Sequence, residues 1–337
     1  MHRVLGLFLL LVSFGVGWAW MDYREFEQAP LDLPADGTTY DFPPGGSAAS
    51  LATAMVAAGY LPARREHYLR WMAWSSGRAA KLKAGEYRLE PGLTASGLLD
   101  LLVSGKVVQY PITVVEGWTF QQLRAEVQKH ETLRHTLAEL DDATLMAALG
   151  KPGEHPEGRF FPDTYLFPRG TTDLEFFTRA YKRMEAVLDQ AWRERAEGLP
   201  YKEPYQALVM ASVVEKESGV AAERPQIAGV FVRRLQKGMR LQADPTVIYG
   251  LGATFDGNLR RRDLETDSPY NSYTRTGLPP TPICLPGRAA IQAALSPGGG
   301  GALYFVAKGD GTHHFSASLD EHQKAVNQFQ RKRQATP

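Results

Sequence analysis

Hydrophobic residues open the chain as one unbroken run and are afterwards mixed with polar residues, as in a folded domain. Residues 4–21 carry no charge, and eighteen helical residues are about 27 Å long, enough to cross the core of a bilayer. Arg3 precedes the run, while Asp22, Glu25 and Glu27 follow it. The positive-inside rule therefore predicts a single-pass anchor over residues 1–21, with the N-terminus in the cytoplasm and the rest of the chain outside.

The same run is also compatible with a cleaved signal peptide, because Gly17-Trp18-Ala19 has the small-x-small form of a cleavage site. Trp18 and Trp20 favour the anchor, since tryptophan gathers at membrane interfaces. Both interpretations export the protein.

Residues 22–46 contain several prolines, which interrupt long helices, and we expect an extended connector there. In the first module, residues 47–150, a glycine turn, a hydroxyl residue and a leucine four positions later recur three times, at Ser47 and Leu51, Thr94 and Leu98, and Thr119 and Leu123. Each hydroxyl can cap a helix whose first buried residue is the leucine, and strand-like runs at 85–89 and 112–115 precede two of the copies. The pattern fits either ordinary βα packing or a small glycan-binding module of the βααβ kind.

Glycine and proline dominate residues 150–158 and predict a second boundary, after which residues 151–337 form another domain. Helical periodicity appears near 172–193, 204–218, 223–237 and 318–332, and residues 303–307 resemble a strand. Helices with a few short strands predict an α+β fold.

A candidate catalytic carboxyl stands at the end of the predicted helix 204–218. Residues 207–214 are apolar or small throughout, so we expect this helix to be buried on most sides. Helical spacing places Glu217 on the face of Val213 and Val214, whereas Glu215 faces elsewhere. Burial and the negative end of the helix dipole both raise the pKa of such a carboxyl, which can then donate a proton to a glycosidic oxygen. A solvated helix end is the alternative interpretation.

Two polar and aromatic stretches, 242–247 and 268–273, are interrupted by proline and are expected to be fixed loops. Side chains in and beside these stretches offer hydrogen bonds and flat faces to a sugar, or they satisfy one another: Gln242, Asp244, Thr246, Tyr249, Tyr270, Asn271 and Tyr273. The charge balance, 38 Lys and Arg against 37 Asp and Glu, argues against a nucleic-acid binder. The single cysteine, Cys284, excludes an intrachain disulfide and a thiolate metal cluster.

Several motifs together resemble the YceG-like, membrane-bound endolytic murein transglycosylases. They are VVEKES at 213–218, GMRLQADPTVIYGLG at 238–252, SPYNSYTRTGLPPTPI at 268–283, EGRFFPDTY at 157–165, and YFVA at 304–307 with His314-Phe315. Two positions depart from the family pattern: Arg233 stands where the family has Asn, and Thr281 where it has Gly. Leu285-Pro286-Gly287 also replaces the usual Asn-Pro-Gly, so roles carried by those Asn and Gly residues do not transfer.

The resemblance implies an anchor in the cytoplasmic membrane, a LysM-like module and a catalytic domain on the extracytoplasmic side. It implies that Glu217 is catalytic and that Ser218 beside it lies at the substrate. The family cuts the β-1,4 bond between N-acetylmuramic acid and N-acetylglucosamine, leaves a 1,6-anhydro end, needs no metal or cofactor, and is thought to terminate nascent strands beside peptidoglycan synthases.

Three other hypotheses stay open from the sequence. The first is a hydrolase that pairs Glu217 with Asp244 or Glu223 as a second acid, since hydrolysis needs two carboxyl groups. The second is a glycan-binding protein without catalysis. The third is a metallohydrolase that uses His313 and His314, although adjacent histidines rarely share a metal.

Overall fold

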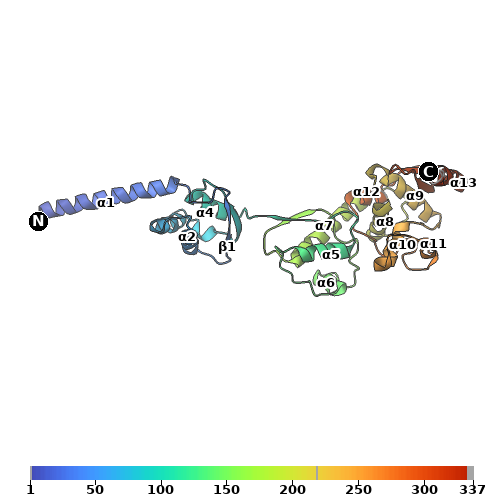
Figure 1. The fold of residues 1–337 in the computed structure, drawn as a ribbon, viewed down its shortest axis with the longest axis horizontal. Coiled ribbons are helices and arrows are strands. Elements are labelled where there is room, and N and C mark those ends of the chain that lie inside the picture. Colours follow the sequence, from blue (N-terminus) through green and yellow to red (C-terminus); the bar gives the residue numbers. More distant parts are fainter. Residues whose placement is uncertain (1, 218, 332–337) are drawn as a thin grey trace. The chain divides into compact units, whose positions relative to one another are not determined.

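The structure is a computed structural model that describes residues 2–217 and 219–331. The chain packs into two compact units (Figure 1). Unit 1 runs through Tyr110 and includes Leu166–Gly170, and unit 2 comprises Pro111–Tyr165 and the chain from Thr171 onward. Residues 111–150 thus pack with unit 2, whereas the functional division into modules at 47–150 and 151–337 stays a prediction.

Helix α1 (His2–Gln28) opens unit 1, and its stretch Leu5–Gln28 is long and apolar enough to cross a membrane, with none of that window buried. This helix fits the predicted anchor. The prediction of an extended connector over residues 22–46 is wrong in two places. Helix α1 continues to Gln28, and residues 38–42 form a strand. Phe26 explains the longer helix, since its side chain is buried in the core of unit 1 and is held there in helical conformation.

Unit 1 surrounds a two-stranded antiparallel sheet, β1 (Thr38–Phe42) with β2 (Gly85–Leu89). Helices α2 (Ala48–Ala57), α3 (Glu66–Ser75) and α4 (Ala95–Ser104), with short 3-10 turns at Ala63–Arg65 and Ala79–Lys81, complete it. Ser47 and Thr94 cap α2 and α4 as predicted, each accepting a backbone N–H at 3.1 Å. Leu51 and Leu98 are fully buried.

Next along the chain come a two-stranded sheet and the first three helices of unit 2. Strands β3 (Tyr110–Thr113) and β4 (Thr164–Phe167) neighbour each other, and β3 starts two residues before the strand expected at 112–115. Helix α5 (Phe120–Lys129) is capped by Thr119 as predicted, and α6 (Asp142–Ala148) and α7 (Asp173–Arg193) follow.

The remainder of unit 2 carries helices α8 (Pro204–Glu217), α9 (Arg224–Gln236), α10 (Asp244–Leu251), α11 (Arg261–Glu265), α12 (Arg288–Leu295) and α13 (Leu319–Val326). Short 3-10 turns cover Ala221–Glu223 and Gly252–Thr254, and a π-helical turn, Asn327–Arg331, follows α13. Strands β5 (Tyr304–Ala307) and β6 (His313–Ser316) pair antiparallel. The helices expected near 172–193, 204–218 and 223–237 are confirmed as α7, α8 and α9, and so is the helix-rich α+β class. The helix expected near 318–332 is the short α13, which the π-helical turn continues to Arg331.

One expectation about unit 2 was wrong. Residues 242–247 were expected to be a loop, but α10 begins at Asp244. Pro245 lies in the first turn of this helix, where its missing N–H costs nothing and its fixed φ favours helix formation.

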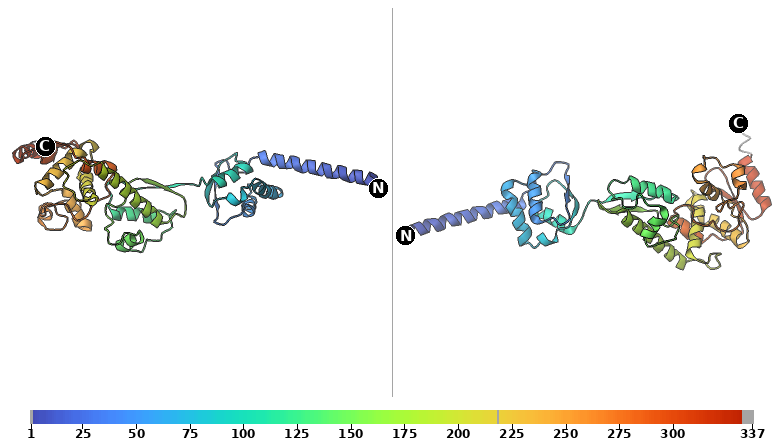
Figure 2. Two further views of the ribbon diagram at one scale, coloured as in Figure 1. Left: turned by 180° about the vertical axis from the view of Figure 1, so that it is seen from behind. Right: turned by 90° about the horizontal axis from the view of Figure 1, so that it is seen from below.

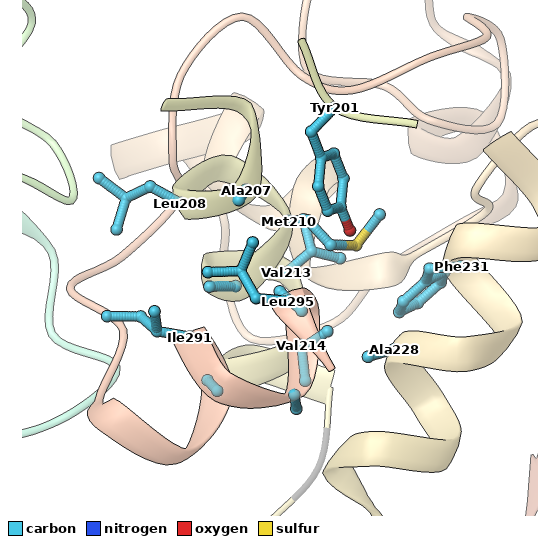
Figure 3. Close-up of a cluster of buried hydrophobic side chains, with 14 of the residues drawn as sticks. Tyr201, Ala207, Leu208, Met210, Val213, Val214, Ala228, Phe231, Ile291 and Leu295 are labelled. Carbon is cyan, nitrogen blue, oxygen red and sulfur yellow. The ribbon is translucent and has the colours of Figure 1, made fainter. Parts of the chain in front are cut away.

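Helix α8 is the centre of unit 2. Its residues 207–214 are all buried, as the sequence predicted for a helix that is apolar on every side. Figure 3 shows side chains of α9 and α12 closing around it, with Phe231 on one side and Ile291 and Leu295 on the other. Because its neighbours fix α8 along its length, the position of its last residue, Glu217, is fixed as well.

Candidate functional site

One carboxyl oxygen of Glu217 is buried without a hydrogen-bond partner among the described residues. This atom, Oε2, is out of contact with solvent. The pKa of Glu217 is raised from 4.5 to about 7, mainly by burial and also by the charge of Asp244, while the charge of Arg234 acts in the opposite direction. An unsatisfied buried polar atom costs about 1–3 kcal/mol, and such costs gather at functional sites.

Glu215 is a useful contrast on the same helix end. Its Oε1 accepts from Arg224 at 2.7 Å and its Oε2 accepts from the backbone N–H of Gly287 at 2.9 Å. These partners fully engage Glu215 in holding α8 to neighbouring segments. The predicted difference between the faces of Glu215 and Glu217 is confirmed.

A pocket of about 410 Å³ opens in front of Glu217. Segments distant in the sequence build its walls: Arg234 from α9, Gln242 and Asp244 at the start of α10, Tyr273, strand β5, and His322 from α13. The polar walls can bind hydroxyl groups, while Phe305 and Val306 add apolar surface. A pocket with both kinds of surface suits a carbohydrate.

Four of the residues predicted from the sequence therefore meet in one place. Glu217, Gln242, Asp244 and Tyr273 all line the pocket. The Tyr273 hydroxyl donates to Asp244 Oδ1 at 2.5 Å, which fixes that carboxylate beside Glu217. Gln242 has a left-handed backbone with φ of 54°, and its Oε1 accepts from Arg234 at 3.3 Å.

The structure does not bring Thr246, Tyr249, Tyr270 and Asn271 to the pocket, contrary to the prediction. Thr246 and Asn271 are buried and use their polar atoms on the local backbone: Thr246 bonds Ala243 O at 2.7 Å, and Asn271 donates to three carbonyls of residues 263–266. These bonds shape the segments that carry Asp244 and Tyr273. Ser218, the remaining predicted residue, lies outside the described residues.

Tyr249 and Tyr270 belong to a separate buried network around Glu157. The Tyr249 hydroxyl donates to Glu157 Oε2 at 3.0 Å, and the Phe120 N–H donates to Oε1 at 2.9 Å. The rings of Tyr249 and Tyr270 meet edge to face at 4.9 Å. Burial raises the pKa of Glu157 to about 7, although these hydrogen bonds oppose it.

Sequence reasoning missed two contributors to the site. Arg234 is buried, donates to Leu303 O and Leu241 O at 2.7 Å, and its positive charge acts to lower the pKa of Glu217. His322 stacks on Tyr304, and burial lowers its pKa. The sequence of α9 could have indicated Arg234, because an arginine on an otherwise apolar helix face needs hydrogen-bond partners in the core.

The histidines proposed as metal ligands have other partners. His313 Nδ1 lies 2.7 Å from Glu223 Oε2, and the His314 ring meets that of Phe329 at a tilt of 39°, with the ring centroids 5.6 Å apart. Burial acts to raise the pKa of Glu223, but hydrogen bonds from His313 hold it below its usual value, so Glu223 is a poor proton donor. Over residues 2–217 and 219–331, no group of three or more His, Cys, Asp or Glu residues is placed to hold a metal ion.

The model of the YceG-like family matches residues 40–328 of the chain. The chain belongs to the YceG-like family. A Bacillus subtilis protein named endolytic murein transglycosylase is 32% identical to this YceG-like chain over 308 residues, covering 86% of the chain and 84% of that protein. A protein of the same name from Streptococcus pneumoniae strain D39 is 27% identical, covering 95% of the chain but only 63% of its own length.

A solved structure supports the same placement in the YceG-like family. The crystal structure of a protein described as YceG-like from Listeria monocytogenes, at 2.6 Å, superposes with a TM-score of 0.55 at 29% identity. The match covers 87% of this chain and 100% of that one.

Proposed function

We propose that this YceG-like protein is an endolytic lytic transglycosylase of peptidoglycan, with Glu217 as its acid and base. The proposal is carried by one observation: Glu217 lies at the wall of a polar pocket, and its buried Oε2 has no hydrogen-bond partner in the part of the chain that the structure describes. A pKa of about 7 keeps roughly half of this carboxyl protonated at neutral pH, as a general acid requires. The names of the relatives supply the substrate, the glycan strand.

In the first step, protonated Glu217 donates its proton to the oxygen that links N-acetylmuramic acid to N-acetylglucosamine. The bond from the anomeric carbon to that oxygen breaks, and the N-acetylglucosamine part leaves as an alcohol. Positive charge develops on the muramic acid ring, and the carboxylate of Asp244, oriented by Tyr273, lies in the same pocket to stabilise it.

In the second step, the 6-hydroxyl of the muramic acid attacks its own anomeric carbon and loses its proton to the Glu217 carboxylate. The new 1,6-anhydro bridge lies on the ring face that the leaving oxygen occupied, so one carboxyl on that face can serve both steps. Glu217 returns to its protonated form, and no water is consumed.

We propose fewer sugar-binding residues than the sequence predicted. Gln242, Asp244 and Tyr273 contact the sugar around the cleaved bond, and Ser218 stays a predicted contact. Tyr249, Tyr270, Thr246 and Asn271 act by shaping the segments around it.

Residues 47–150 are the proposed LysM-like, glycan-binding module, and α1 is the proposed anchor in the cytoplasmic membrane, with the chain after it on the extracytoplasmic side. Arg3 before the apolar run and acidic residues after it support that orientation. Anchoring beside the membrane places the enzyme where strands are made, so we propose that it terminates nascent strands in company with peptidoglycan synthases.

A hydrolase is the second candidate, because Asp244 is a second carboxylate in the same pocket. Water attack requires such a group, whereas the intramolecular reaction does not. The products differ by one water: hydrolysis leaves a reducing end, and the lytic reaction leaves a lighter anhydro end.

The deciding experiment digests purified glycan strands with the full chain and determines the product masses. We expect anhydro ends, and expect Glu217→Gln to abolish turnover while strands still bind, because Gln keeps the shape and lacks the titrating proton. Lys216→Gln, an exposed change on the same turn, is the matched control and should stay active. Turnover by the Glu217→Gln variant would remove Glu217 from the mechanism, and reducing ends would favour the hydrolase.

A further inference from the structure

Helix α3 of unit 1 exposes two tryptophans side by side. Trp71 and Trp74 are 55% and 68% exposed, and their ring centroids are 5.0 Å apart. The opposite face of α3 is buried through Leu69 and Met72, so the helix is held in place while the two indoles point outward. Exposing two adjacent indole rings to water is unfavourable, and an exposed apolar surface of this kind marks an interaction site.

The chain segment that carries the tryptophan pair is basic. Arg64, Arg70, Lys81 and Lys83 are exposed in the segment that carries it. Glu66 is the only acid between residues 60 and 85, and it accepts a hydrogen bond from Thr53. Tryptophan beside lysine and arginine is the composition of a surface that meets the headgroups of anionic lipids.

Contacts with α1 fix this surface relative to the apolar helix. Arg65, at the start of α3, donates to Asp22 at 3.1 Å and to Glu25 at 2.8 Å. One turn later, Tyr68 meets Tyr23 and Phe26 at ring distances of 5.5 and 5.6 Å. Asp22 is the first charged residue after the apolar run, so the docking point lies where α1 would leave a bilayer.

The same contacts give the direction of α3. Between Arg65 and Tyr68 the partners on α1 advance by one residue, or about 1.5 Å, while α3 itself advances about 4.5 Å. The first turn of α3 therefore lies at the level of Asp22 to Phe26 and advances little along α1. This level is within about 8 Å of the end of the apolar run, and the interfacial zone on each side of a bilayer is about 5–8 Å thick.

We propose that the α3 face carrying Trp71 and Trp74 lies in the membrane interface, against the headgroups of anionic phospholipids. The proposal rests on the proposed anchoring by α1. The membrane contact has two parts: α1 crosses the bilayer, and α3 lies on its surface. Unit 1 is then held against the membrane, and the exposed indoles have an apolar environment.

The test uses the full chain in vesicles whose lipids are brominated in the upper part of the acyl chain, because bromine quenches nearby tryptophan emission. The protein has six tryptophans: Trp18, Trp20, Trp71, Trp74, Trp118 and Trp192. Three variants separate their contributions: Trp18→Phe with Trp20→Phe, Trp71→Phe with Trp74→Phe, and all four changes together.

If the proposal holds, the variant that keeps Trp71 and Trp74 loses more emission in brominated vesicles than the fourfold variant does. Equal quenching of these two would overturn it. Quenching of the variant that keeps Trp18 and Trp20 reports on the anchor alone, so failure of the anchor and failure of the α3 contact give different results.

Two further measurements narrow the partner. Quenching of Trp71 and Trp74 should be greater with phosphatidylglycerol than with phosphatidylcholine alone and should fall at about 1 M salt, where screening shortens to about 3 Å. An emission change on adding soluble glycan strands, without quenching by brominated lipid, would assign the pair to glycan binding and overturn the proposal.

Discussion

Replacing Glu217 with Gln should stabilise the protein while it removes activity. The pKa of Glu217 is about 7 in the folded protein and 4.5 for an ordinary glutamate. Between these values the folded protein keeps a proton that the unfolded chain has released, so the free energy of unfolding falls as the pH rises. The difference of about 2.5 pH units corresponds to about 3 kcal/mol, which is an upper limit because the neighbouring groups relax.

The Gln variant does not carry this penalty, since its side chain does not titrate. We expect the two proteins to be about equally stable near pH 4, the variant to gain between pH 4.5 and 7, and the gain to level off above pH 7. Urea unfolding of both proteins from pH 4 to 9 measures the difference. Glu157 also has a pKa of about 7, but it is present in both proteins and cancels.

Lys216→Gln on the same turn is the control and should show no gain that grows with pH. Equal stability of the wild-type protein and the Glu217→Gln variant at pH 8 would refute the reasoning, because it would mean that ionising Glu217 costs nothing in the folded state. A lower stability of the variant at pH 8 would refute it as well and would point to an unseen partner for the carboxylate.

Three more predictions concern neighbouring groups. Asp244→Asn removes a charge that raises the pKa of Glu217, so the alkaline limb of kcat/KM should move to lower pH; an unmoved limb in the residual activity would contradict the coupling. Tyr249→Phe removes the hydroxyl bond to Glu157 and should cost about 1 kcal/mol in urea unfolding, with the product unchanged in mass. Ser47→Ala removes the cap of α2 and should destabilise unit 1 by about 1 kcal/mol, seen in calorimetry as a shift of one transition only.

Local chemistry made much of the fold predictable. A serine or threonine four residues before a buried leucine identified the starts of α2, α4 and α5, because capping depends only on neighbouring residues. Uniform burial of α8 followed from its composition. The start of α10 is not predicted, because a proline after Asp is compatible both with a loop and with the first turn of a helix, which is where Pro245 lies.

The pocket was harder to predict because its walls come from segments far apart in the chain. Tyr249, Tyr270 and Tyr273 look alike in the sequence, yet only Tyr273 lines the pocket, and the other two pack around Glu157. Which tyrosine faces the pocket depends on how α10 and the 268–273 segment pack on α8. That packing is a property of the tertiary structure, so residue type and spacing did not determine it.

The continuity of α1 into unit 1 has a mechanical consequence. Phe26 and the ion pairs of Arg65 fasten unit 1 to the last turns of the helix, and Figure 2 shows α1 entering unit 1 without a break. Because α1 is one continuous helix, no flexible linker separates its apolar part from the residues that pack in unit 1. A membrane-spanning helix tilts to fit the thickness of its bilayer, so a change in bilayer thickness would change the orientation of unit 1 relative to the membrane surface.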